Sequence, residues 1–333
     1  MTTAACQPTI ASSASGPVLG VELRCPRCGS VFDRIERSRT GIRNRLRCCS
    51  CYFVLRAEND IWLALPPERE AYFQPFTNEY QAVRAAEGRG GSDPQYYLRL
   101  PFHDYSGRNQ AQWHIRARTF RYIEQKLLPL LESECARRMK ILDLGAGNGW
   151  LSYRLARVGH FPVAVDLLDD DRDGLGAAQH YLTQLRQEFP RFQAEMDTLP
   201  FESGQFDVAI FNASFHYSAD YETTLREVMR CLRDAGLAII ADTPFYWRDE
   251  SGKQMLKERR AVFEKQFGVR CDGLQSGEYL TPVTLDNLAK SLGIQWHVCK
   301  PWYGLRWAFR PVKARLLRRR EPSKFHLFWF QKG

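Results

Sequence analysis

From residue 139 to the end of the chain, short apolar runs alternate with amphipathic segments. Seven runs lack regular polar alternation, at 139–145, 161–167, 191–196, 206–212, 236–242, 294–299 and 324–331. Such runs are typical of strands that are covered on both faces. The segments between them, including 150–159 and 221–236, carry apolar residues at helical spacing. The pattern predicts an α/β fold with a doubly wound, seven-stranded, mostly parallel sheet.

The rest of the chain divides into segments of different composition. The first 20 residues are rich in Ser, Ala and Thr and have neither a basic start nor a continuous apolar stretch, which predicts a disordered leader. A Cys-rich segment follows, and then a stretch of Pro, Gly and aromatics without a sustained period. We expect a leader at 1–20, a ribbon domain at 21–65, a linker and cover segment at 66–111, and a last domain at 112–333 with insertions at 243–280 and 300–324.

Two C-x2-C pairs lie in the second segment. Nineteen residues separate the pair Cys25 and Cys28 from the pair Cys48 and Cys51. This spacing is typical of a zinc ribbon, in which four thiolates surround one structural zinc ion. Cys49 could replace a neighbouring ligand, and free buried thiols are the alternative reading. The other five cysteines are scattered, which favours a reducing, cytoplasmic compartment over a disulfide framework.

The stretch KILDLGAGNGW, residues 140–150, leads from a predicted strand through three glycines into a predicted helix. A dinucleotide-binding turn has the spacing G-x-G-x-x-G, but here Trp150 stands in the place of the third glycine. Asp143, just before the turn, would repel a pyrophosphate and suits an ammonium group. The turn therefore favours a ligand with an amino acid end, a ribose and a base but no phosphate, such as S-adenosylmethionine.

Four motifs in chain order resemble those of the class I methyltransferases, in the group that includes the ubiquinone and menaquinone biosynthesis enzymes. They are LDLGAGNGW (142–150), AVDL (164–167), AEMDTLPFESGQFD (194–207) and FDVAIFNASFHY (206–217). The third is one residue shorter between its acid and Leu199 than the family's pattern. The resemblance implies a Rossmann-like methyltransferase fold with S-adenosylmethionine as the cofactor.

The resemblance also implies roles for single residues. Asp143 would help to hold the amino acid end of the donor, and the glycine turn would let the backbone approach it. Asp166 would accept hydrogen bonds from the ribose hydroxyls, and Asp197 would contact the adenine amino group beside the Thr198 backbone. The candidate cofactor-binding residues are Asp143, Gly145, Ala146, Gly147, Gly149, Asp166, Asp197, Thr198 and Asn212. For each of the three acids, a capping role is the alternative.

His216 follows Asn212 by four residues, at the end of the fourth predicted strand of the methyltransferase-like region. An imidazole at that place could take a proton near neutral pH, so His216 is the candidate catalytic base. A hydrogen-bonded or packing histidine is the alternative. The same strand lacks the N-P-P-Y or D-P-P-Y sequence of families that methylate exocyclic amines.

The net charge of +9 is concentrated in two segments. Residues 24–56 carry nine Arg against two acids, and residues 300–324 carry nine Lys or Arg against Glu321. The second segment interleaves its cations with Trp302, Tyr303, Trp307 and Phe309. This combination suits a peripheral contact with a membrane surface or stacking on single-stranded RNA, and aromatics packed under the sheet are the third reading.

These observations predict an S-adenosylmethionine-dependent methyltransferase that acts on a small-molecule or lipid-type acceptor. An RNA methyltransferase that binds phosphates through the Arg-rich ribbon is the alternative, and a non-catalytic binding module on the same fold is a further one. No run approaches the roughly 20 apolar residues that a membrane-spanning helix needs. We expect a cytoplasmic protein with peripheral membrane contact through 300–324.

Overall fold

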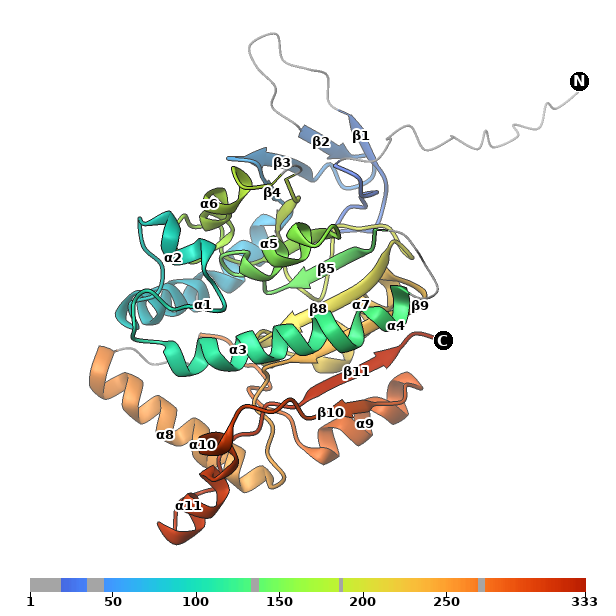
Figure 1. Cartoon of the computed structure of the whole chain (residues 1–333). Coiled ribbons are helices and arrows are strands. Elements are labelled where there is room, and N and C mark those ends of the chain that lie inside the picture. The colour runs from blue at the N-terminus through green and yellow to red at the C-terminus, as the bar shows by residue number, and fades with distance from the viewer. Residues whose placement is uncertain (1–18, 35–44, 133–137, 186–187, 269–272) are drawn as a thin grey trace, which may run out of the picture.

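The computed structural model describes residues 19–34, 45–132, 138–185, 188–268 and 273–333 (Figure 1). The predicted leader up to residue 18 and part of the Arg-rich ribbon segment lie outside them. One sheet of eleven strands runs through the described residues in the order β1-β2-β3-β4-β7-β6-β5-β8-β9-β11-β10. The strands are β1 (Phe32–Arg34), β2 (Arg45–Cys48), β3 (Val54–Glu58), β4 (Ile61–Leu63), β5 (Lys140–Leu144), β6 (Phe161–Asp166), β7 (Arg191–Gln193), β8 (Phe206–Asn212), β9 (Leu232–Ala241), β10 (His297–Cys299) and β11 (Leu327–Gln331).

The helices cover both faces of this sheet. They are α1 (Pro67–Ala86), α2 (Pro94–Leu98), α3 (Gln110–Tyr122), the π-helical turn η1 (Ile123–Leu127), α4 (Pro129–Glu132), α5 (Trp150–Arg157), η2 (Leu175–Ala178), α6 (Gln179–Leu182), η3 (Phe215–Tyr217), α7 (Tyr221–Cys231), α8 (Asp249–Phe267), α9 (Pro282–Leu292), α10 (Leu305–Ala308) and α11 (Arg310–Leu316). Side chains of α3 and α5 belong to one buried apolar cluster, and those of α7 and α9 belong to the other. None of these helices in the described residues is long and apolar enough to cross a bilayer.

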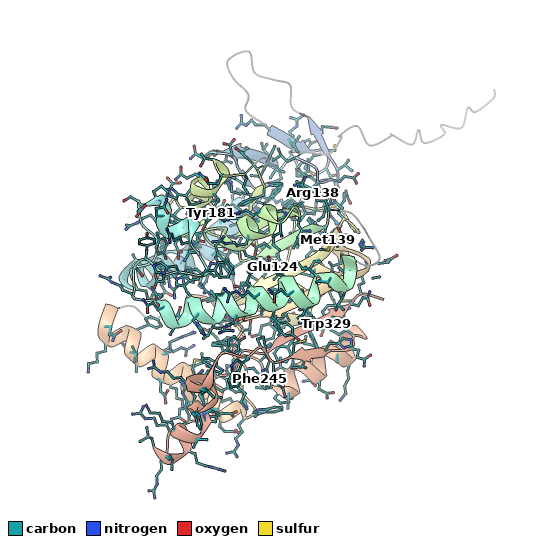
Figure 2. All side chains as sticks on the ribbon, viewed as in Figure 1. Glu124, Arg138, Met139, Tyr181, Phe245 and Trp329 are labelled. Carbon is teal, nitrogen blue, oxygen red and sulfur yellow. The ribbon has the colours of Figure 1, made fainter. Side chains whose placement is uncertain are left out.

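Strands β5 to β11 confirm the predicted sheet. Neighbouring strands from β7 to β9 pair in parallel, and β11 inserts antiparallel between β9 and β10. The order reverses at β5, which lies between β6 and β8. Ligands of open α/β sheets bind at such a switch point, outside the carboxyl ends of the strands. Met139, labelled in Figure 2, lies fully buried at the start of β5.

The ribbon segment is joined to the same sheet. Strands β1 to β4 form an antiparallel meander, and β4 pairs in parallel with β7. Trp62 of β4 is buried, with its ring centroid 6.4 Å from that of Phe192 in β7. The strands of the ribbon domain expected at 21–65 extend the edge that β7 would otherwise expose. Pairing at this edge provides hydrogen-bond partners for backbone groups of β7 that would otherwise be exposed. The local sequence does not indicate that this edge needs a partner.

Residues 66–111 differ from the irregular linker that their composition predicts. The helix α1 occupies 20 of them and begins at Pro67, a favourable first helical position. Phe73, Phe76, Tyr80 and Val83 recur at intervals of three or four residues and mark one face of this helix. Pro75 and many charged residues obscure this signal in the sequence. The expected cover is therefore a helix.

The predicted helix at 221–236 is shorter than expected. Helix α7 ends at Cys231, and the backbone of Leu232 is already extended, with φ −70° and ψ 140°. Leu232 is fully buried and pairs with Phe206 of β8, so Gly236 lies inside β9 instead of ending a helix. Burial of Leu232 in the sheet therefore outweighs the helical preference of the local sequence.

The two predicted insertions lie next to each other. Phe245, in the first, exchanges two backbone hydrogen bonds with Lys324, in the second, at 2.9 and 3.0 Å. Phe245 and Trp329 are labelled in Figure 2, on this part of the molecule. Helix α8 belongs to the first insertion, and α10 and α11 belong to the second. The insertions thus form one structural unit beside the carboxyl end of β9.

Candidate functional site

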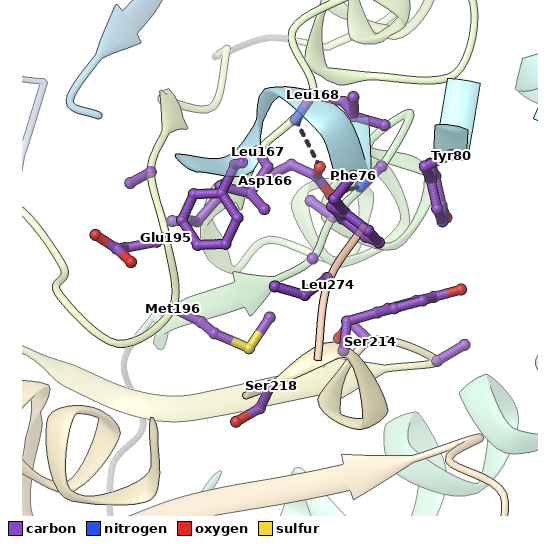
Figure 3. Close-up of a pocket in the computed structure, with 18 of the residues that line it drawn as sticks. Phe76, Tyr80, Asp166, Leu167, Leu168, Glu195, Met196, Ser214, Ser218 and Leu274 are labelled. Carbon is purple, nitrogen blue, oxygen red and sulfur yellow. Dashed lines mark hydrogen bonds between the residues drawn. The ribbon is translucent and has the colours of Figure 1, made fainter. Parts of the chain in front are cut away.

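A cavity of about 120 Å³ lies at the carboxyl ends of β5, β6, β7 and β8 (Figure 3). Figure 3 shows Asp166 and Leu168 on one side of it and Met196 and Ser218 on the other. The candidate residues that line it are Gly145, Ala146, Gly147, Asp166, Asp197 and Asn212. The structure therefore brings six of the nine predicted cofactor-binding residues together at the switch point of the sheet.

The glycine turn after β5 requires its glycines. Gly145 has a φ of +70°, and a Cβ atom there would lie 2.2 Å from the Cβ of Ser214. Gly147 also has a positive φ and donates its backbone N–H to Asp166. Gly149 lies outside the cavity lining and begins α5 as its N-cap residue, with a φ of +77°. Its role is to start the helix.

Asp166 ends β6 and holds the turn in place. Its two carboxylate oxygens accept the backbone N–H groups of Gly147, at 2.7 Å, and of Leu168, at 2.9 Å (Figure 3). Burial raises the pKa of this carboxyl to about 6, while the hydrogen bond from Leu168 is the largest opposing cause. The carboxylate is thus ionised at neutral pH and accepts hydrogen bonds at the cavity wall.

Because the pKa of Asp166 is raised, we expect donor affinity to depend on pH. Below about pH 6 the carboxyl is protonated and loses its charge, so a ligand that donates hydrogen bonds to it binds more weakly as the pH falls. Affinity for S-adenosylhomocysteine, measured by calorimetry, should be about tenfold lower at about pH 5 than at about pH 7. The Asp166→Asn variant should lack this dependence and should bind at about pH 7 about as weakly as the wild type does at about pH 5. An unchanged pH profile in that variant would assign the effect to another group.

The loop after β7 also reaches the cavity. Asp197 lines it and accepts a hydrogen bond from the hydroxyl of Thr224 in α7, and burial raises the pKa of Asp197. Thr198 does not line the cavity. Its place is taken by Met196, whose thioether projects toward the cavity interior in Figure 3. The sequence motif thus corresponds to a loop at the cavity, where Met196 and Asp197 form the lining.

Asp143 does not reach the cavity. It is fully buried and accepts the backbone N–H of Ser152 at 3.1 Å and the Ser152 hydroxyl at 2.8 Å. Burial raises the pKa of Asp143 to about 7, and both hydrogen bonds from Ser152 oppose that rise. The capping alternative for this acid therefore matches the geometry, because its carboxylate fastens the first turn of α5 to β5.

Helix α1 supplies cavity residues that the sequence reasoning missed. Phe76 and Tyr80 line the cavity, and Tyr217 from η3 meets both, with ring centroids 5.8 and 5.5 Å away. Arg84, one turn further along α1, forms an ion pair with Asp173. The spacing of the aromatics on α1 is the signal that could have found them. Together these rings shield one side of the cavity from solvent.

A second cavity of about 310 Å³ adjoins the first. The two share the aromatic residues Phe76, Tyr80 and Tyr217 in their linings. Further residues of the second cavity come from α3, from the first insertion with its helix α8, and from single positions beside the insertions, and include Ile115, Asp242, Arg259, Phe263, Glu278 and Phe325. Two adjoining compartments can hold two ligands side by side, with Tyr217 at their junction.

His216 lines the second cavity and not the first, although the sequence placed it at the cofactor edge. Burial lowers the pKa of its imidazole to about 3, and the positive charges of Arg259 and Arg116 lower it further. Its buried Nδ1 atom has no hydrogen-bond partner among the described residues. The ring is therefore neutral at physiological pH and lies in the wall of the second cavity.

Arg116 of α3 lines both cavities. Arg84 and Arg259 are paired with carboxylates, but no ion pair within the described residues involves Arg116. Its guanidinium lies 4.7 Å from the ring centroid of Trp113, and burial lowers its pKa to about 10, so it stays charged. A partly buried cation without a carboxylate partner favours a ligand that carries an anionic group.

Four thiols lie together at the tips of the ribbon hairpins. The Sγ atoms of Cys25 and Cys51 are 3.5 Å apart, those of Cys28 and Cys48 are 3.4 Å apart, and all four lie within 4.8 Å of one another. Tetrahedral zinc with bonds of about 2.3 Å separates its sulfur ligands by about 3.8 Å. The cluster fits that ion, and Cys49 is exposed and outside it.

Comparison with known proteins agrees with the geometry of the first cavity. A protein family described as "Methyltransferase domain" matches residues 142–240, the span that contains the glycine turn, Asp166, Asp197 and Asn212. Residues 142–240 therefore form a class I methyltransferase domain. The domain supplies β5, β6, β7, β8 and most of β9, so its ligand edge is the one that the first cavity occupies.

The methyltransferase domain has curated relatives. A malonyl-[acyl-carrier protein] O-methyltransferase from Geobacter sulfurreducens is 30% identical over 152 residues, which cover 43% of this chain and 52% of that protein. The uncharacterized methyltransferase YcgJ of Bacillus subtilis is 26% identical over 116 residues, which cover 34% of this chain and 45% of that protein. The chain thus spans about half the length of the curated relatives it matches.

Solved structures with a similar arrangement include the magnesium protoporphyrin IX methyltransferase of Synechocystis PCC 6803, determined with bound SAH. It has a TM-score of 0.46 and 14% identity, and the match covers 79% of this chain and 98% of that chain. A putative sarcosine dimethylglycine methyltransferase from Galdieria sulphuraria has a TM-score of 0.46 and 19% identity, with 64% and 86% covered. These scores are too low to carry a substrate or a mechanism across.

Proposed function

We propose that this protein transfers a methyl group from S-adenosylmethionine to a small-molecule or lipid-type acceptor. The observation that carries the proposal is the meeting of two cavities at Tyr217, one lined by the donor motifs and the other mostly by residues outside them. When bound, S-adenosylmethionine supplies a methyl group that is already activated on a sulfonium. The chain then has to align donor and acceptor and to exclude water.

The residues of the first cavity fit such a donor. Asp166 offers a carboxylate to the ribose hydroxyls, and Asp197 offers one to the adenine amino group. The Oδ1 atom of Asn212 is buried without a partner among the described residues and can accept a hydrogen bond from an ammonium group. Arg116 can bind a carboxylate. Each polar part of the donor thus has a complementary group in the cavity.

The second cavity has the composition of an acceptor site. Its walls combine apolar side chains, among them Ile115, Phe263 and Phe325, with the cation of Arg116. The neutral imidazole of His216 lies in the same wall and can hydrogen-bond an acceptor, but its lowered pKa disfavours the predicted role as catalytic base. The name of the Geobacter relative specifies O-methyl transfer to malonyl-[acyl-carrier protein], and an acidic acyl acceptor would suit these walls.

Incubation with methyl-labelled S-adenosylmethionine and host extract tests the proposal. After separation of RNA, protein, lipid and small-molecule fractions, we expect label in the lipid or small-molecule fraction. A Gly145→Ala variant serves as the blank, for the steric reason given in the Discussion. Label in RNA would replace the proposed acceptor by the alternative one. Absence of label in every fraction, from protein that still binds S-adenosylhomocysteine, would favour a binding module.

A further inference from the structure

A row of exposed apolar side chains follows α10 and α11. Trp302, Leu305, Phe309, Val312 and Leu316 are exposed by 59, 68, 63, 54 and 78%. Leu305, Phe309, Val312 and Leu316 are three or four residues apart and share one face of the helical segment, and Trp302 lies just before it. Figure 1 shows α11 projecting from the body of the molecule, far from the sheet. Contiguous exposed apolar surface of this kind marks a binding surface.

The opposite face of the segment fixes its orientation. The hydroxyl of Tyr303 donates a hydrogen bond to the backbone carbonyl of Phe325 at 2.9 Å. The ring of Trp307 stacks on Phe325 with centroids 5.5 Å apart, and the guanidinium of Arg310 lies 3.7 Å from the centroid of the Trp307 ring. Tyr303, Trp307 and Arg310 are again three or four residues apart. The exposed row is therefore held away from the body by a packed face on the other side.

Cations border the exposed row on both sides. With 3.6 residues per turn, Arg306 and Lys313 fall along one border and Arg315 along the other, and Arg319 follows shortly after the end of α11. All four are exposed, and none takes part in an ion pair within the described residues. An apolar stripe between two lines of cations is the arrangement of a helix that lies in the interface of an anionic bilayer.

We propose that the segment 302–319 docks on the surface of an anionic lipid bilayer. The apolar row enters the boundary between headgroups and acyl chains, and the four bordering cations lie at the headgroup phosphates. Single-stranded RNA fits less well, because Leu305, Val312 and Leu316 offer no ring on which a base can stack. A second copy of the chain would bring two cationic surfaces together, which is unfavourable.

The docking surface is connected to the second cavity. Phe325 lines that cavity, and the ring of Trp307 stacks on the ring of Phe325. Arg259 and Phe263 of α8 line the cavity as well, and Glu258 of the same helix binds Arg320 at 2.6 Å, just beyond the row. A docked segment therefore holds the cavity close to the bilayer. On the basis of the proposed function, the acceptor would then be a lipid-type molecule that enters from the membrane.

Sedimentation with vesicles tests the docking, with the full chain and no requirement for methyl transfer. The wild-type protein should sediment with phosphatidylcholine vesicles that contain phosphatidylserine and much less with phosphatidylcholine alone. The double variant Phe309→Ser, Leu316→Ser should bind at least about tenfold more weakly, since two large apolar side chains no longer enter the bilayer. The double variant Arg306→Gln, Lys313→Gln should lose the preference for phosphatidylserine.

Val283→Ser is the matched control, because Val283 is 69% exposed on α9, outside the row. It should bind vesicles as the wild type does. Wild-type protein that stays in solution with both vesicle types, or Phe309→Ser, Leu316→Ser protein that binds equally well, would overturn the docking. So would a dimer in gel filtration that this variant dissociates, because a second copy would then cover the row. Unchanged S-adenosylhomocysteine binding by the variant keeps this outcome separate from the proposed donor site.

Discussion

Replacement of Gly145 by alanine is expected to weaken the binding of S-adenosylhomocysteine by about 100-fold, which corresponds to about 2.7 kcal/mol. An added Cβ would lie 2.2 Å from the Cβ and 2.9 Å from the Oγ of Ser214. Rotation of the Ser214 side chain cannot relieve the first contact, because the Cβ position is fixed by the backbone. The turn or the end of β8 must therefore shift, and both line the first cavity.

The matched control is Gly293→Ala. Gly293 has a φ of +66°, close to that of Gly145, and an added Cβ would meet nothing within 4 Å. Both variants carry the cost of a left-handed alanine, about 1 kcal/mol, so the difference between them isolates the steric effect on the turn. Calorimetric titration gives the affinities, and thermal unfolding gives the stability. An affinity of Gly145→Ala close to that of Gly293→Ala would contradict the assignment of the turn to the donor.

A second-site change keeps the test decisive if Gly145→Ala proves unstable. Ser214→Gly removes the two atoms nearest to the added Cβ. It also removes the hydroxyl that donates a hydrogen bond to the carbonyl of Leu144, so some stability is lost. The double variant Gly145→Ala, Ser214→Gly should nevertheless bind S-adenosylhomocysteine more tightly than Gly145→Ala alone. A double variant that binds no better would show that the clash is not the cause.

Replacement of Cys25 or Cys51 by serine is expected to abolish zinc binding, from one ion per chain to none. Four sulfur ligands leave no open position for water or substrate, which is typical of a structural zinc. Structural zinc binding is worth about 10–16 kcal/mol in zinc-finger peptides, and that free energy folds the segment that carries the ligands. We therefore expect β1, β2 and β3 to lose protection from proteolysis in these variants.

Cys49→Ser is the matched control for zinc. Cys49 lies next to Cys48 but is exposed and outside the cluster, so its replacement should leave the zinc content at one ion per chain. Metal analysis of freshly purified protein measures the content, and limited proteolysis followed by mass spectrometry locates the cleavage sites. Wild-type protein without zinc would refute the metal site. Zinc loss in Cys49→Ser equal to that in Cys25→Ser would assign the ligands differently.

Local signals in the sequence located most of the donor site. The run of apolar residues in β5, the glycine spacing after it, and the acids that follow β6 and β7 are all features of short segments. Because the carboxyl ends of parallel strands meet at one edge of a sheet, the fold class was enough to bring Gly145, Asp166 and Asp197 together. The cysteine spacing likewise sufficed to predict a cluster of four thiols.

The same reasoning failed where the direction of a side chain decided the outcome. Asp143 and Asp166 both stand at or near the ends of parallel strands, yet Asp143 turns to Ser152 and Asp166 turns to the cavity. His216 lies at the end of the fourth motif but lines the second cavity, among residues of α3 and of the first insertion with its helix α8. These directions depend on packing partners far away in the chain, which no local pattern specifies.

The sequence by itself determined the alternation of strands and helices, the sheet edge where the first cavity lies and the set of four cysteines that cluster. Each of these follows from backbone periodicity or from the spacing of reactive residues along a few turns of chain. Only the tertiary structure decided that β4 pairs with β7, that α1 closes the first cavity, and that the row from Trp302 to Leu316 faces outward. An apolar stripe has the same period whether it is buried or exposed, and its surroundings are set by contacts between distant segments.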